Sequence, residues 1–200
     1  MHQNDIESKM GQHYACIVNE MSYICTLLFC TFAYRNNVQH LRLMKKIINP
    51  YLGKKGYKCI CCSPDNPIGL HLQFWEEGDE VLTKWSPSEN YQGWVDTLHG
   101  GVIAMLMDEV AGWVVNRKLQ TAGMTTRLDI KYRQPVMTTE PLITIKGHIS
   151  AQRRNIVTIH LTLENAKGEI CDEADATYFT FGPERAKEMG FDGCAVEGEE

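Results

Sequence analysis

The chain has 200 residues, of which 44% are hydrophobic, so it is long enough to bury one sizeable core in a single domain. A formal net charge of −5 argues against a general nucleic-acid binder, because phosphate binding needs a basic surface. The eight cysteines lack the spacing of a disulfide framework, and no convincing signal peptide precedes them. We therefore interpret them as reduced thiols of a cytoplasmic protein.

The first 43 residues differ from the rest, because they contain no helix caps, no clean periodicity and no repeat. Their apolar run at 21–34 is too short to span a bilayer, and Glu20 stands where a signal sequence would carry basic residues. Since Met44 offers an alternative start, we expect 1–43 to be a dispensable extension. A domain at 44–183 and an acidic tail at 184–200 follow, and we expect the tail to be frayed or helical at first and disordered at its end.

Beyond residue 66 the apolar residues alternate as they do in strands. Leu70, Leu72 and Phe74 alternate, and 81–85 follows a turn at 77–79, which predicts two antiparallel strands. A long apolar helix is predicted at about 101–119 and four further strand segments from 128 to 181. This order predicts an α+β domain in which a curved antiparallel sheet wraps around one helix. Dimerisation is a frequent way to cover the unused edge and outer face of such a sheet.

The most informative stretch is the His-Gly-Gly turn of His99, Gly100 and Gly101 at the start of that helix. The glycines let a ligand carbonyl approach bare backbone N–H groups, and a helix N-terminus favours developing negative charge. Asp108 follows inside an apolar run, where a carboxylate is costly unless it is paired or used. An oxyanion-stabilising turn followed by an acid indicates acyl chemistry. Glu109 remains a rival acid, because helix geometry alone does not exclude it.

These residues together resemble the hotdog-fold acyl-CoA thioesterases, in the PaaI-type branch that has a His-Gly-Gly turn followed by an Asp on the central helix. The resemblance covers about residues 57–182 and rests on Gln92-Gly93, His99-Gly100-Gly101, Asp108-Glu109, Met124-Thr125 and the segment 128–135. It implies a hotdog fold and hydrolysis of an acyl-CoA to a free acid and coenzyme A. It also implies active sites at the interface of a homo-oligomer, either a dimer or a dimer of dimers.

The resemblance assigns a role to each residue of the motif. The N–H of Gly101, with that of Gly100, would polarise the thioester carbonyl, and His99 would orient the turn. Asp108 would act as general base or as nucleophile. Thr125 would position the water or the carboxylate from the partner subunit. From the residues themselves, Thr125 lies out of phase with the apolar positions of its strand, on the face that meets solvent or a partner.

Three further features leave their role open. Many members of the branch have an Asn at the position of Gly93, and Gln92 is the nearest substitute for its side-chain contact. Arg153 and Arg154, between two strands, could bind the phosphates of coenzyme A or form a plain basic turn. The cysteines at 59 and 62 have CxxC spacing, but a single pair without a suitable histidine is a weak zinc signal. Packed thiols are favoured there, and no metal or cofactor is expected.

Two rivals to a thioesterase remain at this point. One is a non-catalytic module that binds acyl-CoA or an acyl carrier, which could keep the turn without needing Asp108. The other is a dehydratase of the same fold, whose His-centred helix signature is absent here. Neither the acyl group nor the choice between dimer and tetramer follows from the sequence.

Overall fold

The structure is a computed structural model that describes residues 44–199, so the expected extension at 1–43 lies outside the described residues. Its helices are α2 (Gly100–Leu119), α3 (Pro183–Glu188) and the short 3-10 helix η1 (Glu89–Tyr91). Its strands are β1 (Lys45–Lys46), β2 (Phe74–Glu77), β3 (Glu80–Trp85), β4 (Gln92–Trp94), β5 (Thr97–Leu98), β6 (Gly123–Tyr132), β7 (Ile143–Arg153), β8 (Ile156–Glu164) and β9 (Ile170–Thr180).

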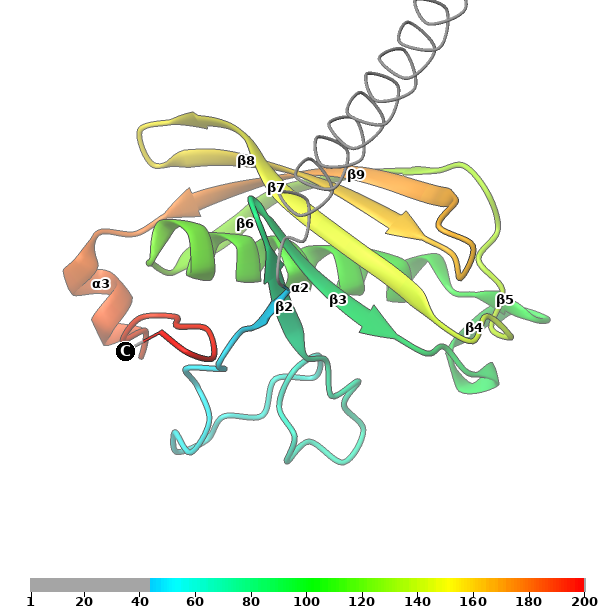
Figure 1. Cartoon of the computed structure of the whole chain (residues 1–200), viewed down its shortest axis with the longest axis horizontal. Coiled ribbons are helices and arrows are strands. Elements are labelled where there is room, and N and C mark those ends of the chain that lie inside the picture. The colour runs from blue at the N-terminus through cyan, green and yellow to red at the C-terminus, as the bar shows by residue number, and fades with distance from the viewer. Residues whose placement is uncertain (1–43, 200) are drawn as a thin grey trace, which may run out of the picture. The chain divides into compact units, whose positions relative to one another are not determined.

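Seven strands form one antiparallel sheet in the order β1-β2-β3-β7-β8-β9-β6, and β4 pairs with β5 apart from it. The sheet curves over α2, as Figure 1 shows, which is the hotdog fold that the sequence predicted. The predicted helix and the strands after it are confirmed with small shifts at their ends. Strand β6 lies at one edge of the sheet.

The core lies between α2 and the inner face of the sheet. The side chains of the helix at this face are fully buried against alternating strand residues, as the period-two and period-3.6 patterns require. Gly147 of β7 lets the helix pack close to the strand, because a Cβ there would lie 3.3 Å from Val110 and from Val114 of the helix. The fully buried positions on the two sides include Leu106, Val110, Val114, Ile145, Ile159 and Leu161.

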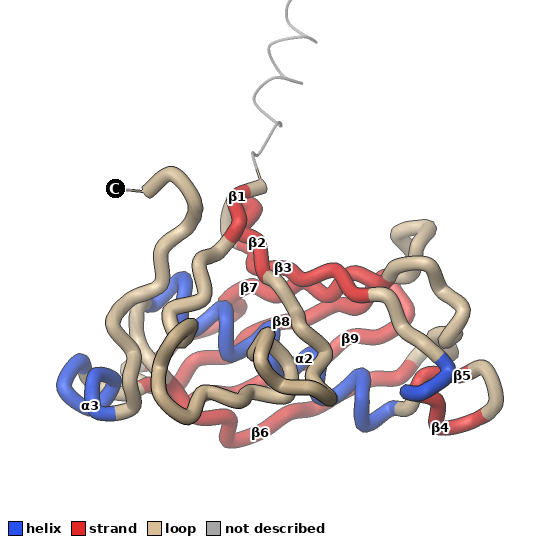
Figure 2. The backbone as a smooth tube through the Cα atoms, turned by 90° about the horizontal axis from the view of Figure 1, so that it is seen from below, coloured by secondary structure: helices blue, strands red, loops and turns tan. Residues whose placement is uncertain are grey.

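The segment at 47–73 has no regular strand or helix, and it lies on the side of α2 that faces away from the sheet (Figure 2). The strand predicted to begin at Leu70 begins only at Phe74. Leu70 and Leu72 are buried, but their N–H groups donate to the carbonyls of Ile60 and Cys61 within the same segment. The alternation of apolar residues therefore predicted correctly which side chains are buried. It predicted wrongly that their backbone would pair with a strand of the sheet.

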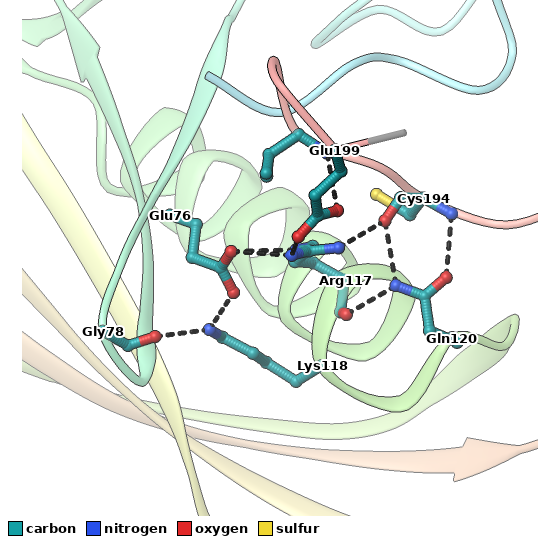
Figure 3. Close-up of polar contacts among 8 residues, drawn as sticks. Glu76, Gly78, Arg117, Lys118, Gln120, Cys194 and Glu199 are labelled. Atoms are coloured by element: carbon teal, nitrogen blue, oxygen red, sulfur yellow. Dashed lines mark hydrogen bonds and ion pairs between the residues drawn. The ribbon is translucent and has the colours of Figure 1, made fainter. Parts of the chain in front are cut away.

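The C-terminal tail corrects another expectation. Its first part is helical, which was one of the two expected forms, but the residues up to 199 are packed on the domain, with Val196 fully buried and bridged to Ile47. Arg117 at the end of α2 donates to Glu76 at 2.8 Å and to Glu199 at 2.5 Å, and Figure 3 shows this network. The acidic end of the tail thus has a cationic partner that the sequence pattern did not reveal.

None of the helices within 44–199 is long and apolar enough to cross a membrane. The cysteines of this part of the chain are free thiols, at positions 59, 61, 62, 171 and 194.

Candidate functional site

The His-Gly-Gly turn is capped by its own histidine. His99 is the N-cap of α2, and its Nδ1 accepts a 2.8 Å hydrogen bond from the N–H of Gly101. The Gly101 N–H is therefore occupied, whereas the N–H of Gly100 has no acceptor within residues 44–199. Gly100 also accepts a 2.9 Å hydrogen bond at its carbonyl from Tyr132. Of the two donors that the resemblance named, the geometry favours Gly100.

The position of Gly93 is filled by the same histidine. A Cβ at Gly93 would lie 2.8 Å from Cδ2 of His99, so no side chain fits there while the imidazole caps the helix. Gln92 is exposed, and its side-chain oxygen accepts from the Asp96 N–H at 3.3 Å. The side chain of Gln92 thus stabilises its own turn, and it has no partner in the His-Gly-Gly turn.

The carboxylate of Asp108 is held by two hydroxyl groups. Thr125 donates to its Oδ1 at 2.7 Å, and Tyr178 of β9 lies 3.2 Å from the same oxygen and 2.9 Å from the Asp108 carbonyl. Burial, and then the nearby Asp108 charge, raise the pKa of Tyr178 above its ordinary value, so its hydroxyl stays a donor. Gly112 leaves room for this ring, because a Cβ there would lie 3.3 Å from the Tyr178 hydroxyl. Oδ2 of Asp108 accepts no hydrogen bond from residues 44–199 and stays available.

The side chain of Thr125 points to the opposite face of the sheet from the one that the sequence predicted, because β6 contains a β-bulge. Thr125 pairs with Tyr178, but the next paired residue is Arg127, so Thr126 is an extra residue in β6. The extra residue reverses the alternation, and Thr125 lies on the same inner face as Leu128 and Ile130. The hydroxyl therefore reaches Asp108 of its own chain, and it needs no second subunit to do so.

Glu109 faces a different set of groups. Trp113 donates from Nε1 to its Oε1 at 2.9 Å, and Sγ of Cys59 lies 3.7 Å from both of its oxygens. Burial, and then the neighbouring Cys59 sulfur, raise the pKa of Glu109 to about 7. Trp113 lies four residues after Glu109 on the same helix, so helix geometry predicts their contact. The cysteines were expected to be packed thiols, and no sequence signal indicated that Cys59 would meet Glu109.

The motif forms two separate half-sites in one chain. We call His99, Gly100 and Gly101 the turn half-site. Gly100 and Tyr132 line a cavity of about 300 Å³ beside it. Asp108, Thr125 and Tyr178 are the carboxylate half-site. A second cavity of about 320 Å³ reaches Asp108 and Tyr178, and its other lining residues are Tyr51, Tyr57, Cys59, Cys62, Glu109, Gly112, Trp113 and Asn116.

Arg153 and Arg154 are not part of either half-site. Arg153 ends β7 and Arg154 begins the turn to β8. The strand register aligns Arg153 through β8 and β9 with Met124 at the start of β6. The turn half-site contacts the other end of that strand, at Tyr132. Within one chain the two arginines and Gly100 therefore lie at opposite ends of the sheet.

Comparisons with known proteins agree with this fold. Residues 96–171 match the thioesterase superfamily, and no curated protein matches the sequence. A hypothetical thioesterase from Streptococcus pneumoniae TIGR4, solved with coenzyme A, is 24% identical with a TM-score of 0.52, over 56% of this chain and 86% of that one. The smu.793 protein of Streptococcus mutans UA159, bound to acetyl CoA, is 19% identical with a TM-score of 0.50, over 56% and 89%.

The PaaI protein of the Escherichia coli phenylacetic acid degradation operon is 12% identical with a TM-score of 0.52, over 56% of this chain and 81% of that one. At these identities the solved structures establish the fold alone. The described domain has the hotdog fold. Residues 96–171, the part that matches the thioesterase superfamily, include the turn, the helix and strand β6 with Thr125, but they end before Tyr178 of β9.

Proposed function

We propose that this chain is an acyl-CoA thioesterase of the PaaI-type branch, which hydrolyses a thioester to a free acid and coenzyme A. The observation that carries the proposal is the Asp108 carboxylate, which two hydroxyl groups hold through Oδ1 while Oδ2 remains free. A free carboxylate oxygen in the wall of a cavity can take a proton from an attacking water, or attack the carbonyl carbon itself. The superfamily match and the likeness to proteins solved with coenzyme A or acetyl CoA support the substrate class.

The N–H of Gly100 supplies the second element of the reaction. As the tetrahedral intermediate forms, the thioester oxygen becomes negative, and a backbone donor at a helix N-terminus stabilises it. The intermediate then collapses, the C–S bond breaks, and coenzyme A leaves as the thiolate. His99 takes part indirectly, because it fixes the turn through the Gly101 N–H.

Completion of the site requires a second copy of the chain. The oxyanion donor and the group that activates water must both lie within a few ångströms of one carbonyl group. Gly100 and Asp108 are eight residues apart on one helix, which corresponds to about 12 Å along its axis. We therefore assign the turn half-site to one subunit and the carboxylate half-site to its partner, in a two-fold dimer with two such sites. This arrangement differs from the expected one, because Thr125 now belongs with Asp108.

The proposal is tested by steady-state hydrolysis of short, long and aromatic acyl-CoAs. Release of coenzyme A should be followed by chromatography, because the protein's own thiols react with thiol dyes. Catalytic turnover is expected, and Asp108→Asn should lower kcat about 100-fold or more while the protein stays folded. Asp129→Asn, which removes an exposed carboxylate of β6, is the matched control.

Two results would contradict the proposal. Saturable binding of acyl-CoAs without product above the rate in buffer would make the chain a binding module. Normal turnover by Asp108→Asn together with an inactive Glu109→Gln would identify the neighbouring acid as the functional one.

A further inference from the structure

Two cysteines and a glutamate meet beside the helix although they lie far apart in the sequence. Cys59 and Cys62 come from the irregular segment at 47–73, and Glu109 comes from the middle of α2. One ligand atom from each of the three lies within 4.8 Å of the other two. Such a group of two sulfur atoms and one oxygen is a donor set for a borderline-soft divalent cation.

The spacing of the donors suits a tetrahedral ion. With Zn–S near 2.3 Å and Zn–O near 2.0 Å, tetrahedral geometry places sulfur and oxygen about 3.5 Å apart. Sγ of Cys59 lies 3.7 Å from each oxygen of Glu109. The ion would therefore need only a small adjustment of these side chains.

We propose that Cys59, Cys62 and Glu109 form a Zn²⁺ site with three protein ligands. All three residues line the cavity that reaches Asp108, so the fourth position of the ion faces this cavity and is open to water. The side chain of Cys61 interacts with Cys59 and Glu109, but Cys61 is not one of the three grouped ligands.

Neighbouring hydrogen bonds orient the ligands for this role. Trp113 occupies Oε1 of Glu109 and leaves Oε2 for the ion. Asn49 donates from Nδ2 to the hydroxyl oxygen of Tyr57 at 2.9 Å, so the Tyr57 proton is free to point to Sγ of Cys62, which lies 2.9 Å away. A thiolate ligand accepts such a hydrogen bond, and partners of this kind fix the orientation of metal ligands.

The site would also give the irregular segment an anchor. Residues 47–73 are held by turns and side-chain contacts, and a bound ion would tie them to α2. Both cysteines precede residues 96–171, the part that matches the superfamily, so the site is a feature of this chain beyond that match. In the sequence the CxxC pair was a weak zinc signal, because its third ligand, Glu109, lies on a helix 50 residues after Cys59.

The test uses the full chain, freed of metal and kept reduced with a non-chelating phosphine. Co²⁺ is added as a spectroscopic probe, and Zn²⁺ is then used to displace it. We expect one Co²⁺ per chain, with thiolate-to-cobalt charge-transfer absorption and the strong visible bands of a tetrahedral ion. Zn²⁺ should abolish both signals and raise Tm, because the ion binds only the folded chain.

Variants decide whether these three residues bind the ion. Cys62→Ser and Glu109→Gln should each weaken Co²⁺ binding at least about tenfold, and Cys59→Ser combined with Cys62→Ser should abolish the charge-transfer band. Cys171→Ser, which changes a buried thiol of β9 outside the group, is the matched control and should keep both signals. A second control replaces the cysteines outside the described residues, which are Cys16, Cys25 and Cys30.

If a serine variant fails to fold, Glu109→Gln still tests the site, because glutamine keeps the shape of the glutamate side chain. Absence of a thiolate-to-cobalt band in the reduced wild-type chain would overturn the proposal. A band that persists in the Cys59→Ser, Cys62→Ser chain would overturn it as well. Since the readouts are metal binding and Tm, they do not depend on thioesterase activity, and a failure here leaves the proposed hydrolysis untouched.

Discussion

Thr125 donates a 2.7 Å hydrogen bond to Asp108 across 17 residues of the same chain. This contact exists because the bulge at Thr126 turns the hydroxyl to the inner face of the sheet. It joins the end of the sheet that carries Met124 to the middle of the helix, and it fixes one carboxylate oxygen so that the other is free. Because of this contact, Thr125 and Asp108 belong to the same half-site of one chain.

We predict that Thr125→Val lowers kcat about 10- to 100-fold, because a hydrogen bond to a charged group contributes about 1.5–3 kcal/mol. Valine keeps the branched shape and loses only the donor. Thr125→Ser keeps the donor and should retain most of the activity. Steady-state release of coenzyme A measures both variants, and wild-type kcat in Thr125→Val would show that the hydroxyl has no part in positioning Asp108.

Gly100 offers a clean test of the oxyanion donor. It is the first residue of α2, where proline is tolerated, and His99 before it has the extended backbone that proline requires, with φ −65° and ψ 129°. Gly100→Pro should therefore fold and lose about 100- to 1,000-fold in kcat, because it lacks the N–H. Gly100→Ala is the control, since a Cβ meets the Tyr132 ring at an ordinary 3.4 Å. Full activity of Gly100→Pro would assign the donor to another group.

The division of the site between two subunits predicts the behaviour of hybrids. Gly100→Pro and Asp108→Asn should each be inactive as homodimers, because each spoils both sites. A hybrid of the two, purified through different tags on each chain, should have one intact site and about half of the wild-type activity.

The matched hybrid pairs Asp108→Asn with Thr125→Val. Both changes lie in the carboxylate half-site, so this hybrid should gain nothing beyond the residual activity of Thr125→Val. If the Gly100→Pro and Asp108→Asn hybrid stays inactive, or if an active monomer sediments alone, the half-sites do not combine across an interface.

The sequence predicted the parts of this molecule that obey one local rule. The helix at 100–119 and the strands at 143–153 and 156–164 have the periodicity of their buried faces, so their faces and approximate limits were readable. Asp108 was found for a related reason, since an acid in an apolar helix contradicts that periodicity. The resemblance added the acyl-CoA substrate and a role for Thr125.

The remaining features depend on contacts between distant residues or on a local exception. An inserted residue such as Thr126 leaves no mark on composition, yet it reverses the face of Thr125. The cap from His99 to Gly101 spans only two residues, but several residue types form caps, and no pattern distinguished the Gly101 donor from that of Gly100. The meeting of Cys59 with Glu109 depends on how an irregular segment lies over the helix, which periodicity does not encode.

The network in Figure 3 leads to a prediction about stability and pH. Glu76 on β2 accepts hydrogen bonds from Arg117 and Lys118 at the end of α2, and both cations are largely buried. Partial burial alone would raise the pKa of Glu76, but the hydrogen bonds from Arg117 and Lys118 outweigh it and lower the pKa below the ordinary 4.5. The folded state thus favours the ionised carboxylate more than the unfolded state does.

Glu76→Gln should therefore lower the free energy of unfolding by about 1–3 kcal/mol at neutral pH, because two cations lose a charged acceptor. The contribution of Glu76 is fully present above its unfolded pKa near 4.5 and disappears as the pH falls through the lower folded value. Urea titrations from pH 7 to 3 should show the wild-type and Glu76→Gln curves converging below about pH 4.5. The neighbouring Glu77→Gln, whose carboxylate has no ion pair within residues 44–199, should remain close to wild type throughout. A gap between the wild-type and Glu76→Gln curves that is equally wide at pH 3 and pH 7 would show that shape, and not charge, accounts for the loss.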